Sequence, residues 1–226
     1  MIKSLNFLIF LSFIFFALYQ TASSQESNVE GILSELRAKY VVTALRTNDA
    51  GIPTYIEGDL TPADAQGDEV NISYFFFEQN QQLFRMEAPP KELVVRKIKD
   101  DNLGMRHIFF KQAYQGIEVY GGELIVHFSP TDRIKVVNGI YKHGIKISPN
   151  PSIQSQTAEK VALSDLEANF GIGDVTDTRL MIYDHKGTYH LIWKIMLMIK
   201  QPPGNWEYFV DASSGDILYK ANRIKF

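Results

Sequence analysis

The spacing of apolar residues changes several times along this chain, and the first change marks the end of a helix. A capping box over 27–30 is followed by apolar residues at helical spacing, which predicts a helix over 28–40. A turn is expected at 51–53, and a strand is expected to begin at 54–56. The N-terminal part of the chain therefore begins with a helix and continues with extended structure.

From residue 70 onward the pattern favours strands, because β-branched and aromatic residues fill short segments between turns. The expected strands cover 70–77, 82–86, 106–114, 123–128 and 134–141. Residues 92–99 give mixed signals. In the segment 123–128, the even-numbered apolar side chains fall on one face of the strand and Glu123, Ile125 and His127 on the other.

The expected domain boundary lies at 148–152, where Pro149 and Pro151 interrupt regular structure. An amphipathic helix is expected over 158–170, ended by Gly171. The strands expected after it cover 180–183, 189–199, 206–210 and 217–219. The odd-numbered side chains of the long strand 189–199 are almost all apolar and should face a core.

The order of these elements indicates an α+β fold. A helix followed by an antiparallel meander can bury one face of the sheet against the helix, and both halves of the chain have a similar make-up. We therefore expect two units, each a helix packed on an antiparallel sheet. The strand–helix–strand alternation typical of a parallel doubly wound sheet is absent from the sequence.

The N-terminus has the pattern of a secretory signal peptide. Lys3 supplies a positive charge, residues 7–19 are almost all apolar, and small residues follow at 21–24. The apolar run of 13 residues is short of the roughly 20 that cross a bilayer as a helix. We expect cleavage near Ser24 and a secreted or periplasmic protein without stable membrane insertion; a retained membrane anchor is the alternative.

Composition narrows the possible functions. The chain has 226 residues, 45% of them hydrophobic, a formal net charge of −3 and no cysteine. Loss of residues 1–24 would remove one lysine and no acid, which leaves −4. A large basic surface for nucleic acid has no support. The lack of cysteine excludes disulfides, thiolate zinc sites and cysteine nucleophiles.

No catalytic motif stands out. The five histidines form no His-Glu-x-x-His, and neither Gly-x-Ser-x-Gly nor a phosphate-binding glycine loop occurs. A metal site at His185 and His190 near Asp184 would need more convergent ligands than the sequence offers. Glu118 and Glu123 could form a carboxylate pair, but surface acids are far commoner. We expect no catalytic residue, no cofactor and no metal.

The segment 104–127 carries a resemblance to a known family. Residues 104–127 contain a histidine, a Gln-x-Tyr-x-Gly run, a Val-Tyr-Gly-Gly-Glu run and a second histidine, and this string resembles the core of the fungalysin/thermolysin propeptide (FTP) domain. The matching positions are His107, Gln112, Tyr114, Gly116, Val119, Tyr120, Gly121, Gly122, Glu123 and His127. Phe109 stands where the family usually has arginine, which puts any partner contact of that arginine in doubt.

The C-terminal part resembles a PepSY domain through the string 206–218, which runs from Trp206 through Asp211 and Gly215. FTP followed by PepSY is the order found in precursors of secreted thermolysin-like metalloproteases. The resemblance implies a signal peptide over 1–24, an FTP-like domain over 25–147 and a PepSY-like domain over 148–226. It also implies two cystatin-like α+β units that template the folding of a protease domain and block its cleft until they are cleaved.

The resemblance assigns two kinds of residue. The candidates for protease binding are His107, Gln112, Tyr114, Tyr120, Glu123 and His127. The structural motif comprises Gly116, Gly121, Gly122, Trp206, Tyr208, Asp211 and Gly215. Two readings of Tyr114 and Tyr120 stay open, since aromatic residues beside glycine can form a contact surface or cap the sheet core. Asp211 is expected to bind the amides of its own hairpin turn.

The expected function is that of a secreted, non-catalytic protein that inhibits a thermolysin-like zinc metalloprotease or assists its folding. The expected partner is the catalytic domain of such a protease. The sequence reaches residue 226 without the zinc-binding motif, near the expected linker to a protease domain. A truncated protease precursor, an exported binding module no longer linked to proteases, and a hydrolase of a new kind are the alternatives.

Overall fold

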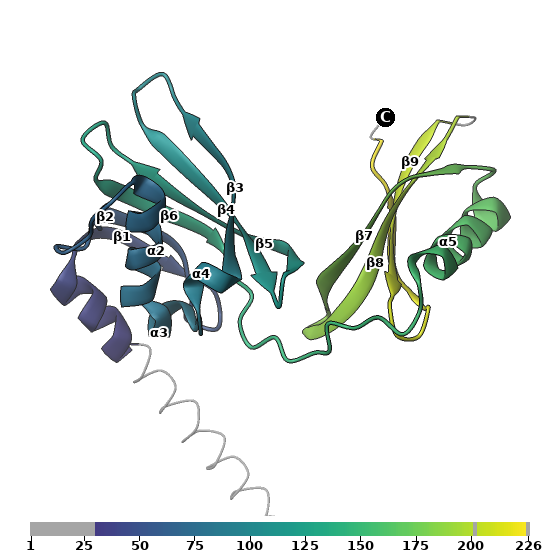
Figure 1. Ribbon diagram of the computed structural model, residues 1–226, viewed down its shortest axis with the longest axis horizontal. Helices are drawn as coiled ribbons and strands as arrows, with labels where there is room; N and C mark the ends of the chain where they lie inside the picture. The colour runs from purple at the N-terminus through teal and green to yellow at the C-terminus, as the bar shows by residue number, and fades with distance from the viewer. Residues whose placement is uncertain (1–29, 201–202, 225–226) are drawn as a thin grey trace, which may run out of the picture.

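A computed structural model describes residues 30–200 and 203–224 of the chain (Figure 1). The expected signal peptide over 1–24 and the start of the expected helix at 28–40 lie outside the described residues. Residues 30–39 are helical. The elements of the first half are β1 (Val41–Thr47), β2 (Pro53–Asp59), α2 (Glu69–Gln79), α3 (Gln81–Phe84), α4 (Pro89–Glu92), β3 (Leu93–Asp100), β4 (Arg106–Tyr114), β5 (Ile117–Phe128) and β6 (Ile134–Ile140). Those of the second half are α5 (Ser155–Asn169), β7 (Asp174–His185), β8 (Thr188–Ile199), β9 (Gly204–Asp211) and β10 (Ile217–Asn222).

The fold is α+β with a mostly antiparallel sheet, as the sequence predicts. Hydrogen bonds run through the strands in the order β1-β2-β6-β5-β7-β8-β9-β10, and β4 joins β5 to the edge strand β3. One parallel pairing, between Val119 of β5 and Ile182 of β7, links the two halves. Strand β5 is therefore shared: its C-terminal part pairs with β6, and its N-terminal part reaches β7.

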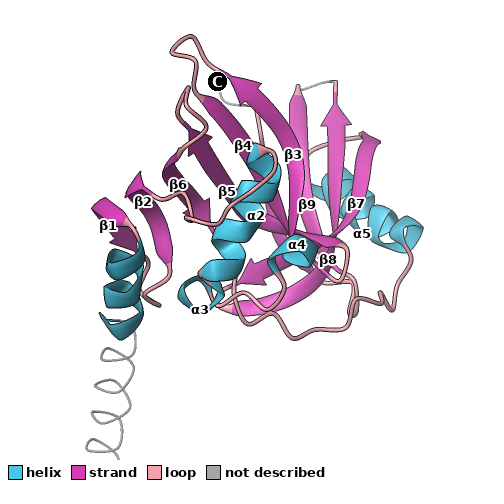
Figure 2. Ribbon diagram, turned by 60° about the vertical axis from the view of Figure 1, so that its left-hand side comes forward, coloured by secondary structure: helices cyan, strands magenta, loops and turns pink. Residues whose placement is uncertain are grey.

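Each half buries one face of its strands against a helix. In the first half α2 lies across the sheet (Figure 2), and Phe76 and Phe77 are both 0% exposed in a core with Phe84 and Phe110. In the second half Ala158, Ala162 and Leu166 of α5 pack on β8 and β9. Figure 1 shows α5 on the outer side of β7–β9, and β3–β5 of the first half next to β7–β9 in the middle of the molecule. Among residues 30–200 and 203–224, no helix covers the opposite face of either half.

Two predicted strands are wrong. Residues 70–77 belong to α2 and residues 82–86 overlap α3, because tertiary packing outweighs β propensity in this segment. Asp68 caps α2 by accepting a hydrogen bond from the Asn71 amide at 2.9 Å. The buried residues of α2 are spaced as on a helix and do not alternate: Ile72, Ser73, Phe76 and Phe77. The mixed segment 92–99 is strand β3, and β1 was not predicted.

The strands with regular alternation are confirmed. Leu124, Val126 and Phe128 of β5 are at most 1% exposed, whereas Ile125 between them is half-buried on the other face. In β8, Ile195 and Leu197 are fully buried against α5, as the apolar odd-numbered face predicts. Strand β7 is longer than expected and covers 174–185.

Candidate functional site

The helix-free side of the first half carries a row of half-buried side chains that we call the open face. It is defined by His107, Phe109 and Lys111 of β4, Glu123, Ile125 and His127 of β5, and Val136 and Asn138 of β6. Register places these residues opposite one another, for example Phe109 opposite Ile125 and Lys111 opposite Glu123. Directly opposed residues of an antiparallel pair share a face of the sheet. Apolar, aromatic and charged groups therefore alternate across this surface.

Next to the open face, the strands of the two halves border a cleft of about 580 Å³. The lining residues are Arg96, Lys111, Glu118, Tyr120, Gly121, Arg179, Met181 and Lys194. They come from β3, β4 and β5 on one side and from β7 and β8 on the other. The cleft therefore exists only because β5 extends beyond its own half and pairs with β7.

Each basic side chain that lines the cleft is paired with a carboxylate, including Arg179, which contacts Asp177. Lys111 Nζ lies 3.0 Å from Glu118 Oε1 and 3.5 Å from Glu123 Oε2, and Arg96 lies 3.4 Å from Glu123. Lys194 Nζ lies 3.2 Å from Glu207 Oε1. A surface of paired charges around apolar groups suits the polar surface of a folded protein better than a simple anion.

Tyr120 joins the two halves and also lines the cleft. Its ring packs edge-on against Phe209 at 4.7 Å and against Tyr183 at 5.9 Å. Its hydroxyl accepts a hydrogen bond of 3.1 Å from Arg223, whose guanidinium also donates to the buried Glu207. Burial, and next the charge of Glu207, raise the pKa of Tyr120. Tyr120 thus closes an aromatic cluster and also borders the cleft, and its role as a contact residue stays a prediction.

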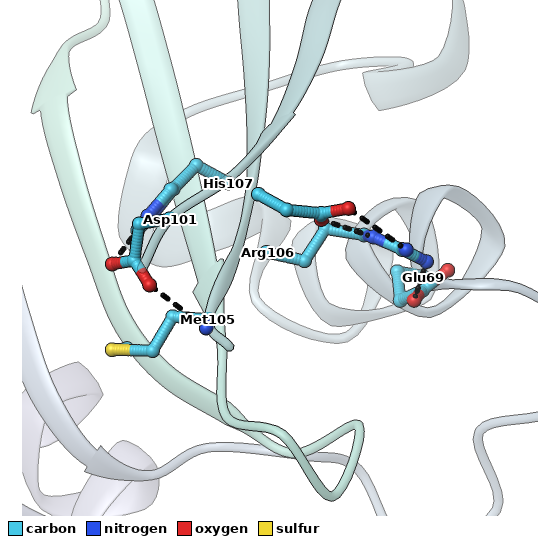
Figure 3. A network of polar contacts seen from close by, with 6 residues as sticks. Glu69, Asp101, Met105, Arg106 and His107 are labelled. Carbon is cyan, nitrogen blue, oxygen red and sulfur yellow. Dashed lines mark hydrogen bonds and ion pairs between the residues drawn. The ribbon is translucent and has the colours of Figure 1, made fainter. Parts of the chain in front are cut away.

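The structure brings His107 and His127 together. Their Nδ1 atoms are 2.7 Å apart, and the rings meet edge-on at 74°. His107 also contacts Asp101 in the turn between β3 and β4, as Figure 3 shows. The neighbouring Arg106 points elsewhere, since it donates hydrogen bonds to Glu69 of α2 at 2.6 Å and to Asp100 at 2.7 Å.

Gln112 lies inside the fold and is 2% exposed. Its amide nitrogen donates to the Lys142 carbonyl at 2.6 Å, and its amide oxygen accepts from the Lys142 amide at 2.8 Å. Gly122 lies so close that a Cβ there would be 2.6 Å from Gln112 Oε1. Tyr114 packs with Val119 in the cluster between the halves. Gln112 and Tyr114 are thus placed to hold β4 and β5 in position.

Three of the motif glycines adopt backbone conformations that favour glycine. Gly116 has φ 81° in the turn between β4 and β5, and Gly121 has φ 74° where β5 passes from one half to the other. Gly215 of the C-terminal hairpin has φ 84°. Trp206 stacks on Phe170 at 3.9 Å, and the buried Tyr208 donates a hydrogen bond to Asp165 at 2.8 Å.

Asp211 binds the amides of its own turn, as predicted. Its Oδ1 accepts hydrogen bonds from Ser213 at 2.7 Å and from Ser214 at 3.0 Å, and its Oδ2 lies 2.7 Å from His190 Nδ1. Burial alone would raise the pKa of Asp211, but these hydrogen bonds outweigh it and lower the pKa. The carboxylate therefore stabilises the β9–β10 hairpin in its charged form.

We expect Asp211→Asn to destabilise the protein by about 2 kcal/mol at neutral pH, because charge-assisted hydrogen bonds are lost. A lowered carboxyl pKa gives stability that is present above the ordinary value near 3.8 and is lost as the pH falls through the folded value. Urea unfolding from pH 7 to pH 2 should therefore show the wild type approaching the variant in acid. A constant difference between the two proteins over this range would contradict the assignment.

Of the other arrangements considered from the sequence, the two histidines and Asp184 do not converge, whereas the two glutamates meet at one lysine. His185 and His190 have ring centroids 6.1 Å apart, while Asp184 accepts a hydrogen bond from Lys142. Among residues 30–200 and 203–224, no three His, Asp or Glu side chains are grouped to hold a metal ion. Glu118 and Glu123 both contact Lys111. Within the same residues, no helix has the length and apolarity to cross a membrane.

Several residues of the site were not singled out by sequence reasoning. Arg96, Lys111, Arg179 and Lys194 line the cleft, yet lysine and arginine at strand positions are ordinary surface residues. Ile125 was placed on the outward face, but nothing in the pattern marked that face as free of a covering helix. The parallel pairing of β5 with β7 has no signature in local periodicity.

A known family model matches part of the first half. The model of the Fungalysin/Thermolysin Propeptide Motif matches residues 91–141. This range starts at the end of α4 and contains β3, β4, β5 and β6, and therefore the whole open face.

The relatives by sequence are bacterial proteases. Bacillolysin of Brevibacillus brevis is 28% identical over 184 residues, which are 76% of this chain and 34% of that protein. Neutral protease B of Bacillus subtilis (strain 168) is 33% identical over 161 residues, covering 68% of this chain and 30% of that protein. Thermolysin of Alicyclobacillus acidocaldarius subsp. acidocaldarius is 26% identical over 181 residues, covering 76% and 33%.

Among solved structures, the Bacillus megaterium YpeB C-terminal domain aligns with a TM-score of 0.39 and 17% identity, over 76% of this chain and 73% of that one. The chain spans about a third of the length of the curated relatives it matches. With the propeptide motif inside the matched region, this chain resembles the propeptide region of thermolysin-like proteases.

Proposed function

We propose that this chain is a secreted, non-catalytic, propeptide-like protein that binds the catalytic domain of a thermolysin-like zinc metalloprotease and inhibits it, assists its folding, or does both. One observation carries the proposal: the propeptide motif over 91–141 coincides with the strands that form the open face and one side of the cleft. Likeness to thermolysin-like proteases over 76% of the chain supports it.

The proposed organisation has three parts: a signal peptide over 1–24, an FTP-like domain over 25–147 and a PepSY-like domain over 148–226. The second and third would be cystatin-like units. The separate cores around α2 and α5 support this division, as does the irregular segment between β6 and α5. Strand β5 would act as the joint that fixes the angle between the units.

The proposed mechanism is complementarity of surfaces, with no chemistry contributed by this chain. The open face and the cleft form one continuous, helix-free surface on which Ile125 and Phe109 supply apolar contact. His107, Tyr120, Glu123 and His127 would meet the partner, whereas Gln112 and Tyr114 would act indirectly by holding β4 and β5. A catalytic domain bound here would be both blocked and supported in its folded shape.

The test is to mix the purified protein with a thermolysin-like catalytic domain and to measure peptide hydrolysis and refolding yield. We expect slower hydrolysis, a higher yield of active enzyme, or both. Glu123→Lys should weaken the effect about ten-fold, because lysine there faces Arg96 and Lys111. Glu167→Lys, the same charge change at an exposed position of α5, is the matched control. Unchanged hydrolysis and unchanged refolding with the wild type would refute the proposal.

The length of the relatives favours a second candidate, in which this sequence is the propeptide part of a longer protease precursor. The matched relatives are about three times as long as the matched region. The same surface would then act within one polypeptide. Reading the gene downstream for His-Glu-x-x-His distinguishes the two candidates.

A further inference from the structure

The feature that the docking role does not use is the chain of contacts through His107 and His127. Asp101 Oδ2 lies 3.1 Å from His107 Nε2, the two Nδ1 atoms lie 2.7 Å apart, and His127 Nε2 lies 2.6 Å from Asn138 Oδ1. Four groups from the β3–β4 turn, β4, β5 and β6 are thereby linked in one line. The side chain of His107 is only 16% exposed, so water competes little for these contacts.

Counting hydrogens shows which protonation states keep the line intact. The Asp101 carboxylate can only accept, so His107 Nε2 must carry hydrogen. The Asn138 amide can accept through its oxygen or, turned over, donate through its nitrogen, so His127 Nε2 can either carry hydrogen or accept one. Between the rings one Nδ1 must donate and the other accept. Two neutral rings satisfy every contact when the Asn138 amide donates, and a pair with one extra proton satisfies every contact when that amide accepts.

The same carboxylate shapes the turn between β3 and β4. Asp101 Oδ1 accepts hydrogen bonds from the amides of Leu103 at 2.8 Å and Met105 at 3.0 Å. Figure 3 shows Asp101 between Met105 and His107. Leu103 is 78% exposed at the end of this turn. The orientation of an exposed apolar side chain thus depends on a carboxylate that is held by the histidine pair.

Few other charges act on the pair. Besides Asp101, three charged residues lie near the pair. Lys99 of β3 is opposite His107. Val136 of β6 is opposite His127; Lys135 precedes Val136 in the sequence, and Glu57 of β2 is opposite Val136. Arg106 and Asp100 pair with each other, and Arg106 also pairs with Glu69 of α2. Within the part of the chain that the structure describes, Asp101 is therefore the only carboxylate in contact with the pair.

We propose that His107 and His127 form a latch, closed by the hydrogen bond between their rings, that holds the β3–β4 turn, and that a second proton on the pair in mild acid breaks the contact between the rings and releases the turn. Two cationic rings would bring N–H against N–H at 2.7 Å, which no orientation of the rings in this contact can satisfy. Since both histidines lie on the open face, the second proton would also weaken binding of the partner. This last step rests on the proposed function; the latch itself does not.

Burial supports the direction of the switch. Burial lowers the pKa of His127 below its ordinary value of 6.5, and the neighbouring charge of His107 lowers it further, against the hydrogen bond to Asn138. A histidine whose folded pKa is lowered stabilises the fold above its ordinary value and loses that contribution as the pH falls through the folded value. The latch is therefore closed at neutral pH and opens in acid.

Nitrogen-15 NMR of the protein alone tests the latch. Near pH 7 we expect one of the two facing Nδ1 atoms to carry hydrogen and the other to accept it. On acidification, the amide signals of Leu103 and Met105 should shift with the same midpoint as His127, and their hydrogen exchange should speed up several-fold. Hydrogen on both facing Nδ1 atoms at pH 7, or turn amides that do not respond when His127 titrates, would overturn the proposal.

Variants separate the latch from general acid effects. Asn138→Asp should move the second midpoint upward by about one pH unit, since a carboxylate favours the charged ring. His127→Phe should abolish the acid response of the turn, and His185→Phe, outside the open face, should leave it intact. An unmoved midpoint in Asn138→Asp contradicts the latch even if His127→Phe does not fold.

The protease assay then separates the two proposals. Inhibition that weakens with the NMR midpoint supports control of docking by the latch. Inhibition that does not change at this midpoint overturns the control of docking by the latch. A failure to inhibit or to assist refolding at every pH counts against the proposed function alone, because the NMR result stands without a partner.

Discussion

Replacing either Phe76 or Phe77 by alanine should lower the free energy of unfolding by about 3–5 kcal/mol, because each leaves a cavity in the first core. Both rings are 0% exposed. Phe76 packs edge-on against Phe77 and Phe84 at 5.5 and 6.3 Å, and Phe77 packs against Phe110 at 6.0 Å. Phe75→Ala, on the half-buried side of the same helix, should cost clearly less. Urea unfolding of the three variants makes the comparison.

This comparison also decides between helix and strand for residues 70–77. On a helix, adjacent positions such as 76 and 77 can both lie within one buried stripe. On a strand, Phe75 and Phe77 would share a face and Phe76 would point the other way. Equal large losses for Phe75→Ala and Phe77→Ala, with a small loss for Phe76→Ala, would contradict the assignment of α2.

Gly122→Ala should lower the free energy of unfolding by roughly 3 kcal/mol, because the new methyl group displaces a buried, fully bonded amide. The added Cβ would lie 2.6 Å from Gln112 Oε1 and 2.8 Å from Gln112 Cβ. The Gln112 side chain cannot move away without losing its two hydrogen bonds to the Lys142 backbone. The loss would be measured by urea unfolding.

Gly116→Ala is the matched control for Gly122→Ala. Gly116 has φ 81° and no atom within 4 Å of an added Cβ, so only the backbone cost of about 1 kcal/mol applies. Combining Gly122→Ala with Gln112→Ala should cost less than the sum of the single variants, because both act on the same contact. Full additivity, or a larger loss for Gly116→Ala, would show that Gln112 does not restrict position 122.

The sequence predicted those parts of the fold that depend on local alternation. Leu124, Val126 and Phe128 alternate with half-buried neighbours on the other face, and a period of two can be satisfied only by a strand with one buried face. Segment 70–77 has no such alternation, and its aromatic residues were assigned to a strand by propensity alone. The segment is helical because Phe76 and Phe77 pack on β4 and α3. Such tertiary contacts are not part of a residue's β propensity.

The site was predictable in its residues but not in its geometry. His107 and His127 were singled out by resemblance, yet a register that sets them opposite each other follows only from the pairing of β4 with β5. The cleft depends on the contact of Val119 with Ile182, two residues far apart in the sequence. No sequence pattern marks Phe109, Ile125 and Lys111 as site residues. They belong to the site because no helix among the described residues covers their face of the sheet. The roles of the predicted contact residues stay predictions.

The most direct test of the account is a titration of thermolysin-like protease activity with the wild type, Ile125→Asp and Ile172→Asp. Ile125 lies on the open face, whereas Ile172 is 81% exposed in the loop between α5 and β7. Urea unfolding first establishes that each variant folds. We predict inhibition by the wild type and by Ile172→Asp, and about ten-fold weaker inhibition by Ile125→Asp. Equal inhibition by all three proteins, or stronger loss with Ile172→Asp, would contradict docking through the open face.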